Sequence, residues 1–137
     1  MDKDEVGRFL GAQTVGRVGC HTGGTTYVVP VIYAWDAGYV YVFSVEGQKI
    51  RMMRENPRVC FEVDEQLAGG GWRSVIIQGT FEELEGEGVD RTRELLVERF
   101  AGRSGDERRR PAESGVVPVA FRIRADEATG RKVERPA

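Results

Sequence analysis

The sequence predicts a small antiparallel β-barrel, closed or partly open, with five or six strands and a few flanking helices. Most apolar residues fall in short β-rich runs, and turns containing glycine separate several of these runs. The chain has 137 residues, of which 40% are hydrophobic and 31% are charged. This length and composition fit one globular domain, residues 1–137, with enough apolar side chains for a core.

The expected elements follow one another with short connections. In chain order they are a helix at 3–11, two strands within 14–35, a strand at 39–44, a helix at 47–55, strands at 58–64 and 72–84, a helix at 89–101 and a strand at 116–124.

Helical spacing and turn chemistry support the first helix and the first hairpin. Val6, Phe9 and Leu10 recur at the spacing that puts them on one helix face. The Gly-Gly pair within residues 22–25 suits the positive φ angles of a tight hairpin turn. Residues 14–35 are therefore predicted to form two antiparallel strands.

The middle of the chain alternates strands with one basic helix. In residues 39–44 aromatic side chains share one face and valines share the other, so we expect both faces to be covered. A helix that starts near Gly47 must end before Asn56, because a residue that precedes proline is disfavoured in a helix.

The second half of the chain holds the longest predicted helix. Apolar residues recur among charges in 89–101, and Gly102 follows as a stop, so we expect this helix to pack outside the barrel. The polar segment 102–115 cannot bury enough apolar area to order itself and is expected to be a mobile loop. After the strand at 116–124, residues 128–137 are either a polar tail or a final edge segment.

Composition argues against several classes of function. The formal charge of −2 and the isoelectric point near 5.6 provide no overall attraction to nucleic acid or anionic membranes. The arginine run at 108–110 has no interleaved aromatic residues, so we expect no nucleic-acid partner. No apolar run has the length of a membrane helix, and the acidic start lacks the features of a signal peptide. A cytoplasmic protein with no membrane partner is the expectation.

The cysteines and the histidine are too few for common metal and nucleophile chemistry. Cys20 and Cys60 lie in separate apolar stretches, where they are expected to be small core residues, with a disulfide as the alternative. His21 is the only histidine. We therefore expect no metal site and no Ser-His-Asp triad.

Pro30 is unusual because it interrupts a run that otherwise resembles a central strand, where proline removes a hydrogen-bond donor. One explanation is an edge or bulged position. The other is a strand flank left open for a flat ligand, which would bind the backbone groups of Val29, Val31, Ile32 and Tyr33.

The basic segment 47–59 also has two interpretations. Lys49 and Arg51 fall in the first turns of the predicted helix, where the dipole disfavours cations and the free N–H groups favour anions. Ser44 could cap this helix or donate its hydroxyl to the same anion. The segment is therefore either a phosphate or carboxylate site or a solvated amphipathic helix.

Residues 69–74, "GGGWRS", place Trp72 and Arg73 together at the start of a strand. An aromatic ring beside a guanidinium suits a ring-plus-phosphate ligand or a protein interface. The alternative is a tryptophan at the strand end that covers the core.

Taken in order, these stretches resemble a known family. The run "TYVVPVIYAWDAGYVYVFS" is followed by "GQKIRMMRENPRVCFEVD" and "WRSVIIQGTFEEL", and the likeness covers residues 14–84. The stretches "LLVERFAG" and "ATGRK" extend it over most of the chain. Together they resemble the pyridoxamine 5′-phosphate oxidase-like flavoproteins, in their nitroimidazole-resistance and general flavin-binding branch.

The resemblance implies a mainly β fold, a six-stranded antiparallel split β-barrel of the FMN-binding type with flanking helices. It also implies a homodimer with flavin sites at the subunit interface. In that arrangement Lys49 grips the FMN phosphate, with Gln48 or Arg51 as helpers, and no catalytic side chain or metal is required. The cofactor-binding residues that it implies are Val29, Pro30, Val31, Ile32, Tyr33, Phe43, Ser44, Lys49, Arg51, Trp72, Arg73 and Ser74.

The resemblance further implies an oxidoreductase in which FMN passes electrons from a reduced nicotinamide cofactor to a small organic acceptor. Deazaflavin and haem are alternative cofactors, and a non-catalytic carrier on the same barrel is the alternative function. His21 is the candidate imidazole ligand for haem. The tail after residue 124 lacks the histidine that oxidases of pyridoxamine phosphate use, so that activity is not expected. Ser44 stands where many nitroimidazole-resistance relatives have histidine, which weakens a specific assignment to nitroimidazole reduction.

Overall fold

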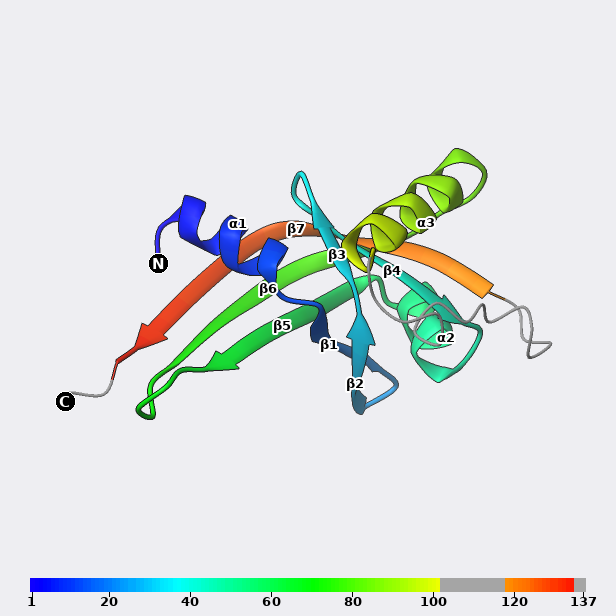
Figure 1. Cartoon of the computed structure of the whole chain (residues 1–137). Helices are drawn as coiled ribbons and strands as arrows, with labels where there is room; N and C mark the ends of the chain where they lie inside the picture. Colours follow the sequence, from blue (N-terminus) through cyan, green and yellow to red (C-terminus); the bar gives the residue numbers. More distant parts are fainter. Residues whose placement is uncertain (102–117, 135–137) are drawn as a thin grey trace.

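The computed structural model describes residues 1–101 and 118–134 of the chain. Figure 1 shows a strongly bent sheet with helices against it. The elements are α1 (Lys3–Ala12), β1 (Val15–Thr22), β2 (Thr25–Ile32), β3 (Ala34–Asp36), β4 (Tyr39–Val45), α2 (Gln48–Glu55), β5 (Arg58–Gln66), β6 (Trp72–Glu83), α3 (Glu87–Arg99) and β7 (Pro118–Val133).

The strands form one antiparallel sheet in the order β2-β1-β5-β6-β7-β4-β3. The two end strands, β2 and β3, are consecutive in the chain and only Tyr33 separates them. Because one residue joins the two ends, the sheet must curl until they approach each other, which produces a barrel split between β2 and β3. The predicted split barrel is confirmed, but the described chain has seven strands instead of six, since the run at 25–36 breaks at Tyr33.

The side of the sheet inside the barrel, here called the inner face, carries the core. Val18, Phe61, Ile77 and Phe121 are completely buried there. The Tyr33 ring packs edge-on against Phe61, with ring centroids 5.0 Å apart. Aromatic pairs of this geometry add to the stabilisation that burial provides.

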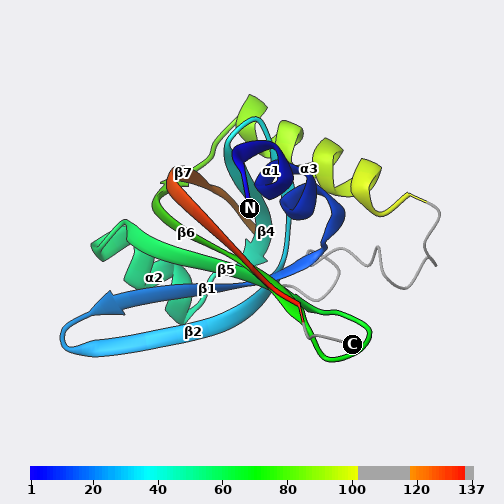
Figure 2. The same cartoon turned by 90° about the vertical axis from the view of Figure 1, so that its left-hand side faces the viewer.

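Two helices pack against the barrel interior. The side chains that were expected to share one face of α1 are buried, and Asp2 caps this helix by accepting from the Glu5 N–H at 2.9 Å. Helix α2 ends at Glu55, as the following Asn-Pro pair predicts. Its Ile50 and Met53 side chains are completely buried. Helices α1 and α2 lie at different ends of the long strands (Figure 1), and α2 lies beside β1 (Figure 2).

Helix α3 packs outside the barrel against β4 and β7, as the sequence predicts. Arg91 pairs with Asp36 at 3.1 Å, and the Arg93 guanidinium lies 5.3 Å from the centre of the Phe43 ring. Both faces of β4 are therefore covered. None of the described helices combines the length and the apolar character of a membrane-spanning segment.

The C-terminal part of the chain forms more regular structure than its polar sequence suggests. Strand β7 runs through to Val133, and beyond residue 124 it pairs with β6 alone. The edge-segment alternative for this region is confirmed over the described residues. The predicted mobile loop at 102–115 and the arginine run at 108–110 lie outside the described residues.

Candidate functional site

Strand β2 presents one free edge. Within the described sheet it pairs only with β1, so the edge-position explanation for Pro30 holds. The Tyr33 N–H donates to the Thr14 carbonyl on the β1 side at 3.0 Å. Because backbone groups alternate along an antiparallel strand, Val29 and Val31 also turn toward β1, whereas Val28, Pro30 and Ile32 turn away from it.

This alternation changes which residues can bind a ligand. The backbone groups of Val29 and Val31 are used by the sheet, and Val31 is buried in the core. The side chains of Val28 and Ile32 are 62% and 54% exposed. The resemblance places residues 28–33 along the flavin ring, but Val28 is not among the cofactor-binding residues named above. A proline at an open edge implies that the residues two positions away also face that edge, which includes Val28.

The start of α2 lacks a side-chain cap. Gly47 is the N-cap residue, so Ser44 does not cap this helix. Arg51 makes the first helical hydrogen bond, from its N–H to the Gly47 carbonyl at 3.1 Å. The N–H groups of Gln48, Lys49 and Ile50 therefore have no partner within the helix and are available to an anion.

Lys49 stands in the first turn of this uncapped helix. Its side chain is half-buried, and within residues 1–101 and 118–134 it forms no salt bridge. Burial lowers the pKa of its ammonium group below the usual value, and the nearby Cys20 thiol opposes this effect. An amine that is partly buried without a carboxylate destabilises the fold, so its position suits an anionic ligand better than packing.

Arg54, one helical turn after Ile50, has a structural role. Its guanidinium donates to Glu83 at 2.7 Å and also pairs with Glu46 at 2.9 Å. Arg51 is exposed. The basic residues of the 47–59 segment therefore differ in their surroundings: Arg54 is paired with carboxylates, Arg51 is exposed, and Lys49 is half-buried in the first turn.

Lys49 belongs to α2, which packs against β1, the strand that pairs with β2. Lys49 interacts electrostatically with Cys20, and Cys20 pairs across the hairpin with Tyr27, the neighbour of Val28. A phosphate at the start of α2 and a flat ring along β2 could therefore belong to one ligand. Ser44, near the end of β4, is half-buried and immediately precedes the turn into α2.

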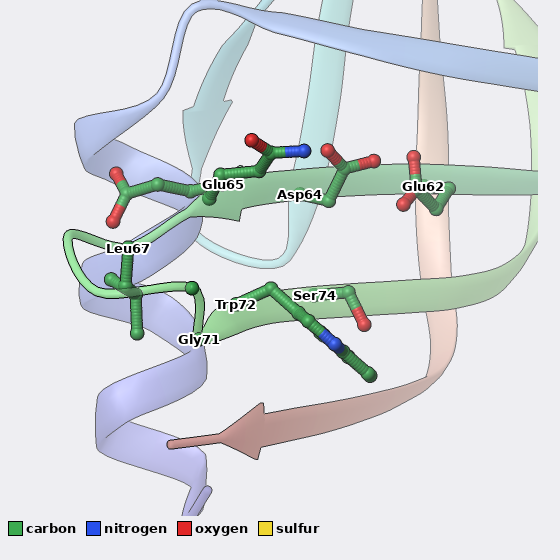
Figure 3. A pocket seen from close by; sticks show the side chains of 9 residues that line it. Glu62, Asp64, Glu65, Leu67, Gly71, Trp72 and Ser74 are labelled. Carbon is green, nitrogen blue, oxygen red and sulfur yellow. The ribbon is translucent and has the colours of Figure 1, made fainter. Parts of the chain in front are cut away.

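Trp72 and Ser74 lie at the opposite end of the long strands. They line a hollow of about 440 Å³ at the β5–β6 hairpin, together with Glu62 and Asp64 (Figure 3). Trp72 is 37% exposed, so it does not act as a cover for the core. From the strand register, Trp72 is about 25 Å from the Cys20 region that holds Lys49.

Three predicted residues have other partners in the structure. Arg73 points to the inner face, where it donates to Glu65 at 2.6 Å. Tyr33 is completely buried, and its hydroxyl donates to the Leu10 carbonyl at 2.6 Å. Phe43 lies beneath α3. The Tyr33 and Arg73 side chains contact α1, and Phe43 contacts α3, so all three help to hold these helices on the barrel.

Comparison with protein families gives an extensive match. The family model for pyridoxamine 5′-phosphate oxidase matches residues 2–132. The crystal structure of a FAD-binding protein from Mesorhizobium loti is 35% identical, with a TM-score of 0.83, over 98% of this chain and 96% of that chain.

Two further similarities are more limited. A candidate 5-nitroimidazole antibiotic resistance protein from Bacteroides thetaiotaomicron is 22% identical, with a TM-score of 0.77, over 96% of this chain and 84% of that chain; it supports the fold. The uncharacterized protein RA0666 from Rhizobium meliloti (strain 1021) is 34% identical over 84 residues, which are 61% of this chain. The match spans 56% of that relative's length.

Proposed function

Because the chain belongs to the pyridoxamine 5′-phosphate oxidase family, we propose that it is a flavin-dependent oxidoreductase that works as a homodimer. The ligand is a flavin nucleotide, either FMN or its adenylylated form FAD. The FAD-binding relative from Mesorhizobium loti supports a flavin. Both nucleotides carry a phosphate on the ribityl chain, which is the group that the proposed site recognises.

One observation carries the proposal: Lys49 is half-buried without a salt bridge in the described chain, beside three N–H groups that α2 leaves free. A phosphate at this position would accept hydrogen bonds from the helix N-terminus and would neutralise the lysine. It would also raise the pKa of the Lys49 ammonium, so the lysine would stay charged in the complex.

The free edge of β2 would hold the ring. Val28 and Ile32 each offer an N–H and a carbonyl, whereas Pro30 offers only a carbonyl and lets the ligand approach where an N–H would otherwise project. Their exposed apolar side chains would border the flat ring and exclude water from it. Ser44 and Arg51 are proposed as minor contacts near the phosphate.

The second copy would supply Trp72 and Ser74. Within one chain these residues are about 25 Å from the Cys20 region that holds Lys49, too far to touch the same flavin. A symmetric dimer could bring the Trp72 end of one chain to the Lys49 end of the other. Two equivalent sites would result.

A bound flavin would supply the transfer of electrons from a reduced nicotinamide cofactor to a small organic acceptor. The residues of this chain would bind the phosphate, orient the ring and exclude water. Histidine is missing from the tail after residue 124, so the proposed substrate is not pyridoxamine phosphate.

Absorbance of the purified protein tests cofactor binding directly. We expect flavin bands, with the released cofactor identified as FMN or FAD by chromatography and mass spectrometry. We then expect oxidation of NADH or NADPH when a nitroaromatic acceptor is supplied. A colourless protein that takes up neither FMN nor FAD would refute the proposal. A Soret band would select haem, a deazaflavin spectrum would select that cofactor, and bound flavin without turnover would favour a carrier.

A further inference from the structure

One face of the described sheet carries most of the exposed apolar side chains. This outer face consists of the residues of β1, β2, β5, β6 and the end of β7 that point away from the barrel interior. Helices α1 and α2 pack on the opposite side. Of the seven large hydrophobic side chains exposed in the described chain, six lie on the outer face: Val15, Val28, Ile32, Trp72, Ile76 and Val133.

A cluster of three charged residues lies within this apolar surface. One nitrogen of Arg17, Nη1, is 3.0 Å from a Glu62 carboxylate oxygen and 3.0 Å from an Asp64 oxygen. Pro30 pairs with Arg17 on one side, and Ile76 pairs with Glu62 on the other. The cluster has one positive charge for two carboxylates, so it bears a net negative charge when both are ionised.

We propose that a second copy of this chain covers the outer face, and that the Arg17–Glu62–Asp64 cluster takes up a proton as the two copies associate. This inference rests on the homodimer of the proposed function. It adds the surface that the dimer uses and a dependence of the dimer on pH.

The size of the outer face suits a second copy of the chain. Five strands about 4.8 Å apart and about eight residues long cover roughly 650 Å², close to the ~800 Å² per partner of stable protein interfaces. The face carries both signs of charge, with Arg17 and Arg131 beside Glu62, Asp64 and Glu127. A surface with both signs can be complementary to itself across a twofold axis.

The groups around Glu62 determine the direction of the pH effect. From β1 it faces Arg17, and from its own strand it faces Asp64 and Cys60. On β6 its neighbours are uncharged: Ser74, Ile76 and Gln78. Burial, together with the hydrogen bond and the charge of Asp64, raises the pKa of Glu62 to about 6, and Arg17 opposes this rise.

A second copy would remove more water from Glu62, so its pKa would be higher in the dimer than in the free chain. A group whose pKa rises on association binds a proton in that step, and association is then favoured as the pH falls. If the pKa of Glu62 rises by one unit on association, the dimer dissociation constant at a pH above both pKa values is about tenfold higher than at low pH for each copy. The two copies together give a factor of about 100.

The experiment measures the dimer dissociation constant by sedimentation at pH 5.5 and pH 8. Urea is added at equal concentration if the dimer is too tight to dissociate. For the wild type we expect the constant to be at least tenfold lower at pH 5.5. Glu62→Gln should associate at pH 8 as tightly as the wild type does at pH 5.5, with little dependence on pH. Glu127→Gln removes another carboxylate from the same face and should keep the wild-type dependence.

The outcomes separate this inference from the proposed function. A wild-type dimer with equal constants at both pH values, or a Glu62→Gln variant that keeps the dependence, would overturn the proton uptake. A dimer that survives in Ile76→Glu at both pH values would overturn the outer face as its surface. A chain that stays monomeric at both pH values would overturn the dimer itself, while the flavin absorbance independently reports cofactor binding.

Discussion

Replacing Lys49 with methionine removes the ammonium group that the proposed site uses for the flavin phosphate, and keeps a long side chain at this position. A hydrogen bond to a charged group contributes about 1.5–3 kcal/mol. Lys49 is half-buried and has no competing carboxylate in the described chain, so we expect a loss within this range. This corresponds to FMN binding that is weaker by roughly 10- to 150-fold.

The assay compares two ligands that differ only in the phosphate. Binding of FMN and of riboflavin is measured by the change in flavin fluorescence for the wild type and for Lys49→Met. Riboflavin lacks the phosphate, so its affinity should be the same for both proteins. Arg8→Met removes one positive charge from an exposed position on α1 and should affect neither ligand.

The fold of the variant should not suffer. Burial lowers the pKa of the Lys49 ammonium in the folded chain. At neutral pH the charged lysine therefore reduces the free energy of unfolding. Lys49→Met should therefore melt at the wild-type temperature or higher. Equal losses of FMN and riboflavin affinity, or no loss of FMN affinity, would refute the assignment of Lys49 to phosphate.

Three further substitutions test other parts of the account. Gly79→Ala would place a Cβ 2.5 Å from a β7 carbonyl oxygen and should lower the free energy of unfolding by about 1–3 kcal/mol in urea, whereas Gly7→Ala, in open space on α1, should not lower it; equal stability of the two variants would contradict the close approach. Tyr33→Phe should cost about 1–2 kcal/mol and speed hydrogen exchange in α1, because a buried carbonyl loses its donor; unchanged exchange there would contradict the role of the hydroxyl. Arg73→Met should leave flavin affinity within about threefold, since Arg73 faces inward, whereas Trp72→Ala should weaken it by about tenfold or more; a reversed order would contradict the assignment of faces.

Local patterns were sufficient to predict much of the fold. The Gly-Gly turn at 22–25 takes positive φ angles of 54° and 81°, as a tight hairpin requires. The predicted end of α2 before Asn56 was also correct. Each of these features depends on residues that are adjacent in the chain, so short-range chemistry decides them.

The errors in the predicted fold come from long-range pairing. The break at Tyr33 could not be seen, because that residue continues an apolar run and only its burial against Phe61 marks the corner between β2 and β3. The full length of β7 was also hidden. Its end is polar because most of its side chains are exposed, and the small Gly130 lies against Val6 of α1.

The candidate site was only partly accessible from the sequence. Lys49 could be proposed from its position in the first turn of a helix, but its partial burial and lack of a salt bridge are tertiary features. The opposite orientations of Trp72 and Arg73 follow from strand alternation once the strand is known. The Arg17–Glu62 pair joins residues 45 positions apart, and no local pattern indicates it.

The central claim is that each flavin site combines Lys49 of one chain with Trp72 of the other. Mixing Lys49→Met with Trp72→Ala chains and allowing subunits to exchange tests it directly. A shared site predicts that the mixed dimer regains one intact site, so about a quarter of all sites should bind FMN with wild-type affinity. If the mixture binds FMN only as weakly as the two variants do separately, Lys49 of one chain and Trp72 of the other do not form a shared site. That result would contradict the account.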